Sequence, residues 1–186
     1  MKNMKKICKI SLWVLLFTFL YSPAALARTM YDETLNNGAL VLVAGHMGAG
    51  RYADLSSVVV QQEAPPEYRI AINGVTIQFS DDYFREYKTY AGSPFTIRNA
   101  TQYVFRYHLN SKTIWYYSER LKKWVLWDID RDHTRADGHP LIPYTAEAAF
   151  AAAYDMRFFD DKEGYSPSRR QYSRVIDESF YKRLGI

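Results

Sequence analysis

The pattern of apolar and polar positions predicts that the first two thirds of the chain are mostly β-strand. The apolar run at residues 40–43 and the segment 55–62, which has three valines at its centre, are strand candidates, and glycine or proline residues follow each of them. The segment YRIAINGVTIQF, residues 68–79, alternates apolar and polar positions around Asn73-Gly74. This pair predicts a β-hairpin, and the alternative is one long strand with a bend or bulge at Gly74.

Residues 101–129 have the most regular pattern and predict an antiparallel meander. Three β-rich runs are separated by the turn-forming pair Asn110-Ser111 and by a charged stretch at residues 120–123. Upstream of this region, Ser80 and the two aspartates that follow it can cap a short helical turn.

The last third of the chain changes from a period of two to a helical period. Thr145 can cap a helix over residues 146–159, in which aromatic side chains recur every four positions. Ser166-Pro167 predicts the start of a second helix, which Gly185 ends. Strands followed by helices predict an α+β fold: an antiparallel β-sheet of about five to six strands, including the three-strand meander, with two C-terminal helices packed on one face.

The first residues have the layout of a secretory signal peptide. Lysines precede an apolar stretch at residues 10–21, and residues 25–27 match the small-residue cleavage site. The apolar stretch is shorter than the about 20 residues that a spanning helix needs, so a retained membrane anchor is the less favoured alternative. We therefore predict an exported protein, periplasmic or secreted, with a signal peptide at 1–27, a single domain at 28–186 and no membrane span after cleavage.

Removal of this leader changes the charge balance. The whole chain carries 24 Lys and Arg against 20 Asp and Glu; four of the lysines and none of the acids precede Arg28, so residues 28–186 carry 20 of each sign. A neutral domain lacks the basic surface that supports nucleic-acid or anionic-membrane binding, so we expect no nucleic-acid partner. Cys8 also lies in the leader, which leaves the predicted domain without disulfides or thiol chemistry.

The segment GHMGAGRY, residues 45–52, nearly matches a phosphate-binding loop. Gly45 and Gly50 have the required spacing, but Arg51 and Tyr52 occupy the positions of the lysine and the hydroxyl residue that hold phosphate and magnesium. The residues that follow favour a strand, whereas a phosphate loop opens a helix. We therefore predict a glycine-rich turn between two strands, and no nucleotide cofactor.

Three aspartates after the meander have the alternating spacing of a calcium loop. These are Asp128, Asp130 and Asp132. His133 and His139, however, stand where such a loop needs glycine and a bidentate glutamate. The sequence therefore favours a solvated acidic loop, with a calcium site at these three aspartates as the alternative, and we expect no cofactor.

The same loop, residues 128–139, is the basis of an enzymatic alternative. His133, Asp137 and His139 could act in an extracytoplasmic hydrolase, but their spacing within one loop does not show that they meet. The sequence contains no Gly-x-Ser-x-Gly elbow and no His-Glu-x-x-His motif. Whether the protein is an enzyme stays open at this point, and the sequence favours a non-catalytic domain.

The meander contains the best candidate for a binding surface. A two-residue turn at Asn110-Ser111 would place Arg106 opposite Trp115 and give one sheet face a mixture of aromatic and polar side chains. The residues of that face are Arg106, His108, Trp115 and Tyr117. Such a mixture recognises sugars, peptides or partner proteins, although packing in the core is the alternative.

The position of Trp127 depends on the second turn of the meander. A loop of about five residues would place Trp127 beside Trp115 as a further binding residue, and a one-residue slip would turn it into the core. The sequence does not decide between the two registers.

Two segments resemble uncharacterised exported bacterial proteins: GRYADLSSVVVQQEAPPEYRIAINGVTI, residues 50–77, and HPLIPYTAEAAFAAAYDMRFF, residues 139–159. In those proteins a Tyr-Ala-Asp-Leu strand precedes a paired-proline turn and a Tyr-Arg-Ile-Ala strand. The resemblance implies export and a single domain, and it implies no catalytic residues. The leading hypothesis is a non-catalytic domain that binds an unknown ligand or an envelope protein through the aromatic sheet face; the sequence gives no oligomeric state.

Overall fold

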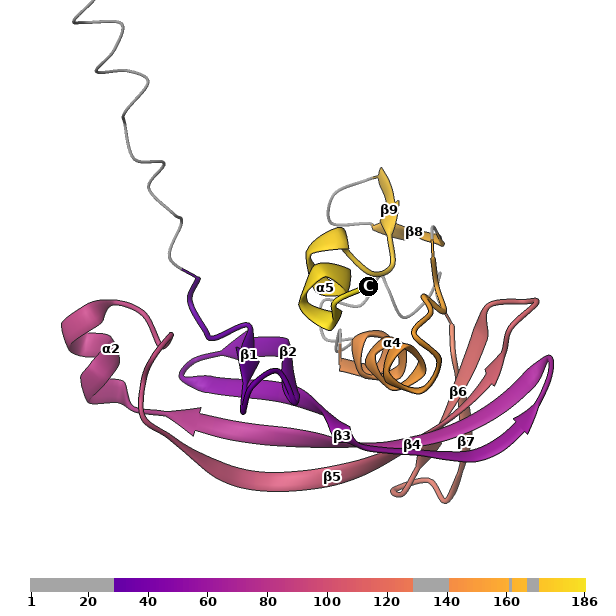
Figure 1. The fold of residues 1–186 in the computed structure, drawn as a ribbon, viewed down its shortest axis with the longest axis horizontal. Helices are drawn as coiled ribbons and strands as arrows, with labels where there is room; N and C mark the ends of the chain where they lie inside the picture. Colours follow the sequence, from indigo (N-terminus) through magenta and orange to yellow (C-terminus); the bar gives the residue numbers. More distant parts are fainter. Residues whose placement is uncertain (1–28, 129–140, 161, 167–170) are drawn as a thin grey trace, which may run out of the picture.

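A curved, seven-stranded antiparallel sheet forms the body of the molecule (Figure 1). The computed structural model describes residues 29–128, 141–160, 162–166 and 171–186. The strands lie in the sheet in chain order: β1 (Thr34–Leu35), β2 (Leu40–His46), β3 (Ala49–Ala64), β4 (Glu67–Phe79), β5 (Phe95–His108), β6 (Thr113–Ser118) and β7 (Lys123–Trp127).

Three helices and a separate hairpin complete the described chain. The helices are α2 (Asp81–Tyr87), α4 (Leu141–Tyr154) and α5 (Glu178–Leu184), and the hairpin pairs β8 (Glu163–Ser166) with β9 (Gln171–Arg174). The predicted α+β class and antiparallel sheet agree with this arrangement. The main sheet has more strands than the predicted five to six, and the C-terminal elements differ from the prediction in detail.

The glycine motif forms the turn between β2 and β3, as predicted. Met47 and Gly48 have φ angles of 46° and 77°, which are the left-handed angles that a tight two-residue hairpin requires. Gly45 is needed for a different reason, because a Cβ there would lie 2.4 Å from the Tyr31 ring. A strand and not a helix follows the turn, so the segment lacks the geometry of a phosphate loop.

β4 runs without interruption through Asn73-Gly74, so the predicted hairpin at this pair is wrong and the single-strand alternative is confirmed. Tertiary packing explains the glycine, because a Cβ on Gly74 would lie 2.6 Å from the Tyr103 ring on the neighbouring strand β5. The turn that joins β3 to β4 lies at Pro65-Pro66.

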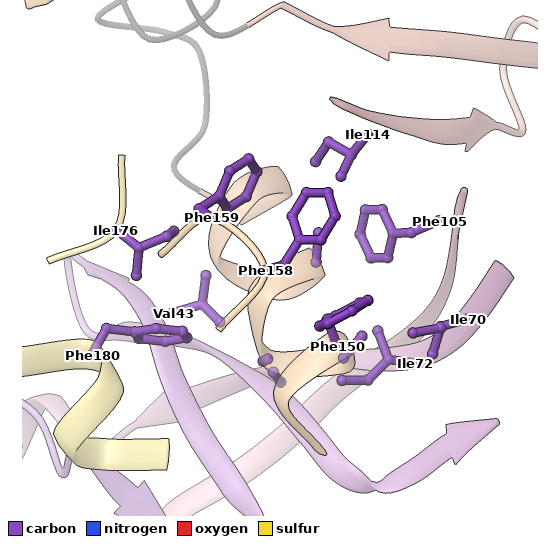
Figure 2. Close-up of a cluster of buried hydrophobic side chains, with 14 of the residues drawn as sticks. Val43, Ile70, Ile72, Phe105, Ile114, Phe150, Phe158, Phe159, Ile176 and Phe180 are labelled. Carbon is purple, nitrogen blue, oxygen red and sulfur yellow. The ribbon is translucent and has the colours of Figure 1, made fainter. Parts of the chain in front are cut away.

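The main core lies between the sheet and α4, on the side that we call the inner face. Tyr107 on β5 is fully buried there, and its hydroxyl donates a hydrogen bond of 2.8 Å to the Ala146 carbonyl of α4. Figure 2 shows Phe150 and Phe158 pointing toward Phe105 and Ile72 of the sheet. These contacts hold α4 against β4 and β5, and the helix also lies against β2 and β3.

The helix predicted at residues 146–159 is displaced in the structure. α4 begins earlier, with Pro143 in its first turn where a missing N–H has no cost, and Thr145 is a buried residue inside the helix rather than its cap. It ends at Tyr154, after which Asp155 takes a φ of 54°. Phe158 therefore reaches the core from the segment after the helix.

The second predicted C-terminal helix is wrong over its first half, where the chain forms β8 and β9. Val175 and Ile176 match the helical pattern, but they are buried in the core immediately before α5 begins. α5 has Asp177 as its N-cap, and Gly185 ends it with a φ of 83°. The predicted start at Pro167 lies outside the described residues.

A second aromatic cluster covers one end of the opposite side of the sheet, which we call the outer face. Its buried members are Tyr31, Leu40, Tyr52, Val75, Ile77, Phe79 and Tyr90. The Tyr31 ring stacks on Tyr90 at 5.2 Å, so the N-terminal segment is part of this cluster. The other end of the outer face, formed by β4 to β7, carries the candidate binding residues.

Candidate ligand-binding face

The register of β5 and β6 is the one that the sequence predicts. Arg106 lies opposite Trp115, and Phe105 lies opposite Tyr116. The turn between the strands is a four-residue loop, in which Lys112 has a φ of 53°. The structure therefore brings together the four predicted residues on the outer face: Arg106, His108, Trp115 and Tyr117.

Arg106 connects Trp115 to an acidic residue of β4. Its guanidinium carbon lies 5.5 Å from the centre of the Trp115 ring, and its Nη2 donates a hydrogen bond of 2.9 Å to Glu67 Oε1. The side chains of Arg106 and Glu67 are each 41% exposed. A cation–π contact and an ion pair at such exposure each contribute about 1 kcal/mol or less, so they position Arg106 more than they stabilise the fold.

Arg69 and Trp124 extend this group of side chains. Arg69 on β4 lies directly opposite Arg106, and its guanidinium carbon is 5.5 Å from the centre of the Trp124 ring on β7. Trp124 in turn meets the Tyr117 ring edge to face at 5.6 Å. We refer to Arg69, Arg106, Trp115, Tyr117 and Trp124 as the outer-face cluster.

Arg69 was not among the binding residues predicted from the sequence, and the side of the sheet on which Trp124 lies was left open. The alternation of residues 68–79 does place Arg69 on the side opposite Ile70 and Ile72, and this is the signal that could have been used. The pairing of β4 with β5, however, is not fixed by a short turn. The side of Trp124 depends on the loop between β6 and β7, whose length the sequence left open.

Trp127 is not part of the outer-face cluster. Ile114 pairs with Trp127 and Trp115 pairs with Leu126, so the register that places Trp127 beside Trp115 is wrong. Trp127 is 7% exposed, and its ring packs edge to face on Phe159 at 5.8 Å. The loop between the strands is one residue shorter than the binding register needs, which turns the indole into the core.

His108 lies on the outer face, but its ring is hydrogen-bonded to Ser111 of the β5–β6 turn. Its Nδ1 lies 3.3 Å from the Ser111 backbone nitrogen, which donates to it, and 2.9 Å from Ser111 Oγ. Ser111 Oγ is also 2.8 Å from Thr113 Oγ1. His108 therefore stabilises the β5–β6 turn at the edge of the candidate face.

The side chains of the outer-face cluster are partly exposed. Its aromatic rings are half-buried, and Leu126 and Val59 beside it are 43% and 54% exposed. A hollow of roughly 550 Å³ lies at the end of α4, and one of roughly 130 Å³ lies beside Arg51 and Tyr103. Neither of these hollows is lined by a residue of the outer-face cluster.

The predicted acidic and hydrolase residues lie largely beyond the described chain. Asp128 follows β7 in the structure, whereas Asp130, Asp132 and the candidate hydrolase residues fall within 129–140, outside the described residues. Within residues 29–128 and the described C-terminal segments, no group of three metal-ligating side chains occurs.

A buried carboxylate, Glu147 of α4, lies on the other side of the sheet. Its Oε1 accepts a hydrogen bond of 2.8 Å from the Phe158 N–H, and its Oε2 accepts one of 3.0 Å from the Phe159 N–H. Burial raises the pKa of Glu147 to about 7, although these N–H groups, Tyr181 and Lys112 act to lower it. Glu147 is not among the site residues predicted from the sequence.

The surroundings of Glu147 assign it a structural role. Neither hollow includes it, and both of its oxygens hold the segment that turns back after α4. The Tyr181 hydroxyl of α5 lies close enough to act on its pKa but is buried without a hydrogen bond of ordinary geometry. A perturbed carboxylate often marks an active site, but this one faces protein groups.

No helix in the described ranges combines the length and apolar character that a bilayer span requires. Comparison of the chain with protein-family models, with curated proteins and with solved structures found no match.

Proposed function

We propose that this protein is an exported, non-catalytic domain that binds a ligand or an envelope protein through its outer-face cluster. The observation that carries this proposal is a group of two half-buried indoles, a tyrosine and two guanidinium groups on paired strands, with α4 packed against the opposite face. Aromatic and arginine side chains contribute apolar contact area together with hydrogen bonds to a bound molecule.

The chemistry of the cluster favours binding over catalysis. Its neighbouring carboxylate, Glu67, is paired with Arg106, and His108 is engaged by Ser111. A catalytic Ser–His pair needs a third group that orients the histidine ring. Ser111 Oγ does lie 2.9 Å from His108 Nδ1, but no carboxylate among the described residues bonds to that ring, and Ser111 Oγ is also in contact with Thr113 Oγ1.

Export rests on the leader at residues 1–27. Expression of the full chain in a bacterial host, followed by fractionation and N-terminal sequencing, tests it. We expect a product that begins near residue 28 in the periplasm or the medium. Recovery of the intact chain from the cytoplasm would contradict export and leave the fold unaffected.

The tryptophans allow a direct test of binding. After the leader the chain contains Trp115 and Trp124 on the outer face and Trp127 in the core. A Trp127→Phe variant therefore reports on the outer face alone, and a variant with Trp115→Phe and Trp124→Phe reports on the core alone.

Titration of both variants with panels of glycans, cell-wall fragments and envelope proteins should change the fluorescence of the outer-face reporter and leave the core reporter unchanged. Trp115→Ala should weaken the response. The proposal is contradicted if the outer-face reporter responds to no member of these panels.

A further inference from the structure

Arg69 stands out because its positive charge has no acidic partner among the described residues. Its guanidinium lies against the Trp124 ring, and its Nε is buried without a hydrogen bond. Arg106, directly opposite, has its ion pair with Glu67. Glu67 is therefore the single carboxylate that the described strands β4 to β7 provide for two adjacent arginines.

Two like charges directly opposite each other on neighbouring strands destabilise a sheet. The fold brings Arg69 and Arg106 together in this way and orients each guanidinium with an indole ring, at 5.5 Å in both cases. The pair leaves one uncompensated positive charge beside the aromatic rings. An anionic ligand would remove this repulsion and provide acceptors for the terminal Nη groups of Arg69, because its Nε is covered by the protein.

The guanidinium of Arg69 indicates which kind of anion would bind. A guanidinium group presents parallel N–H groups that match the two oxygens of a carboxylate, and the cation–π contact with Trp124 restricts where the Arg69 group can lie. The rings of Trp115, Tyr117 and Trp124 lie within the same cluster and offer apolar surface next to that carboxylate.

The backbone favours a ring-shaped ligand over an extended peptide. Arg106 and Trp115 lie on strands that pair with each other, and Trp115 pairs in turn with Leu126 on β7. The backbone between these strands is already hydrogen-bonded, so a ligand over the cluster is contacted by side chains, and near the cluster a strand could add only at the outer edge of β7, the last strand of the described sheet. Planar rings suit the faces of sugars.

We propose that the outer-face cluster binds a carboxylate-bearing glycan, with Arg69 holding the carboxylate and the aromatic rings contacting the sugar faces. This inference rests on the proposed binding function and specifies its ligand class. Charge complementarity at Arg69 is its basis.

The test compares two probes that differ only at their carboxyl groups: trigalacturonic acid, which is ionised at neutral pH, and its fully methyl-esterified form, which is uncharged. Both are titrated into residues 28–186 carrying Trp127→Phe, with tryptophan fluorescence as the readout and calorimetry as confirmation. We expect the acid to bind at least about tenfold more tightly than the ester, because loss of one charge-assisted contact changes affinity by about that factor.

Variants at Arg69 separate charge from packing. Arg69→Met keeps an apolar stem against Trp124, so it should reduce affinity for the acid to that for the ester and leave affinity for the ester unchanged. Arg69→Lys keeps the positive charge but lacks the two parallel N–H groups of the guanidinium, so its affinity for the acid should be intermediate. Arg51→Met removes an exposed arginine of β3 that lies outside the cluster and should change neither affinity.

Three results would overturn the inference. Equal affinity for acid and ester would reject the carboxylate while leaving the binding function in place. A response to acidic peptides or to vesicles containing anionic lipid, with none to trigalacturonic acid, would reject the glycan. Unchanged affinity for trigalacturonic acid in a folded Arg69→Met variant would show that Arg69 does not bind the carboxylate. Failure of the binding function itself would instead appear as unchanged tryptophan fluorescence with every member of the glycan, cell-wall and envelope-protein panels.

Discussion

Glu147 and Arg69 are ionisable groups on opposite faces of the sheet, and their partners differ. The protein itself supplies the donors to Glu147: two backbone N–H groups, with Tyr107, Tyr181 and Lys112 nearby. Arg69 has an aromatic ring beside it and no acidic partner among the described residues. A buried charge whose partners belong to the fold serves the fold, whereas an unpaired charge at an open face is available to a ligand.

The largest expected effect comes from the two indoles that the β6–β7 register separates. Trp127→Ala should lower the free energy of unfolding by about 3–5 kcal/mol because it empties a core position against Phe159. Trp115→Ala should cost about 1 kcal/mol, since the ring is half-buried on the outer face. Urea denaturation measures both variants, and similar losses would show that the two faces are not distinguished by burial.

The distinction between these indoles also shows what the sequence can predict. Asn110-Ser111 fixes the β5–β6 register locally, so Arg106 and Trp115 could be placed on one face before the structure was known. The charged stretch after β6 contains no equivalent pair to define a turn, and a one-residue difference decides the face of Trp127.

Long-range packing accounts for the features that the sequence did not predict. Asn73-Gly74 has the composition of a hairpin, yet its glycine accommodates the Tyr103 ring of the next strand. Glu147 is the one acidic residue of the alanine-rich helix α4. The N–H groups that donate to it belong to Phe158 and Phe159, eleven and twelve residues later, where the chain turns back after the helix. Neither relation leaves a periodic signal in the sequence.

Glu147→Ala should lower the free energy of unfolding by about 3 kcal/mol, because it leaves the Phe158 and Phe159 N–H groups buried and without acceptors. Glu119→Ala is the matched control, since its side chain is 73% exposed and pairs with Lys122 in a turn. This control should change stability by less than about 0.5 kcal/mol. Equal behaviour of the two variants in urea denaturation would contradict a structural role for Glu147.

The raised pKa of Glu147 predicts that stability falls as the pH rises. The native carboxyl titrates near pH 7 and the unfolded one near its ordinary value of 4.5. Between these values the native state holds a proton that the unfolded state has released, so stability is highest at the acidic end of this window and declines toward pH 7 by up to about 3 kcal/mol.

Denaturation from pH 5 to pH 8 measures this decline, and Glu147→Gln should flatten it because the amide does not titrate. The window lies above the lowered pKa values of Asp177 and Glu178, whose protonation acts at lower pH. A variant that keeps the full slope would assign the pH dependence to another group.

The smallest predicted effect concerns the contribution of Tyr181 to the pKa of Glu147. The Tyr181 hydroxyl acts to lower the pKa of Glu147, so Tyr181→Phe should raise that pKa and move the midpoint of the stability decline upward by up to about one pH unit. Because the hydroxyl is buried without an ordinary hydrogen bond, stability at pH 5 should change by less than about 1 kcal/mol. Tyr165→Phe, at an exposed ring of the β8–β9 hairpin, provides the control and should leave the midpoint in place. An unchanged midpoint in Tyr181→Phe would mean that the backbone N–H groups and Lys112 alone oppose the effect of burial on Glu147.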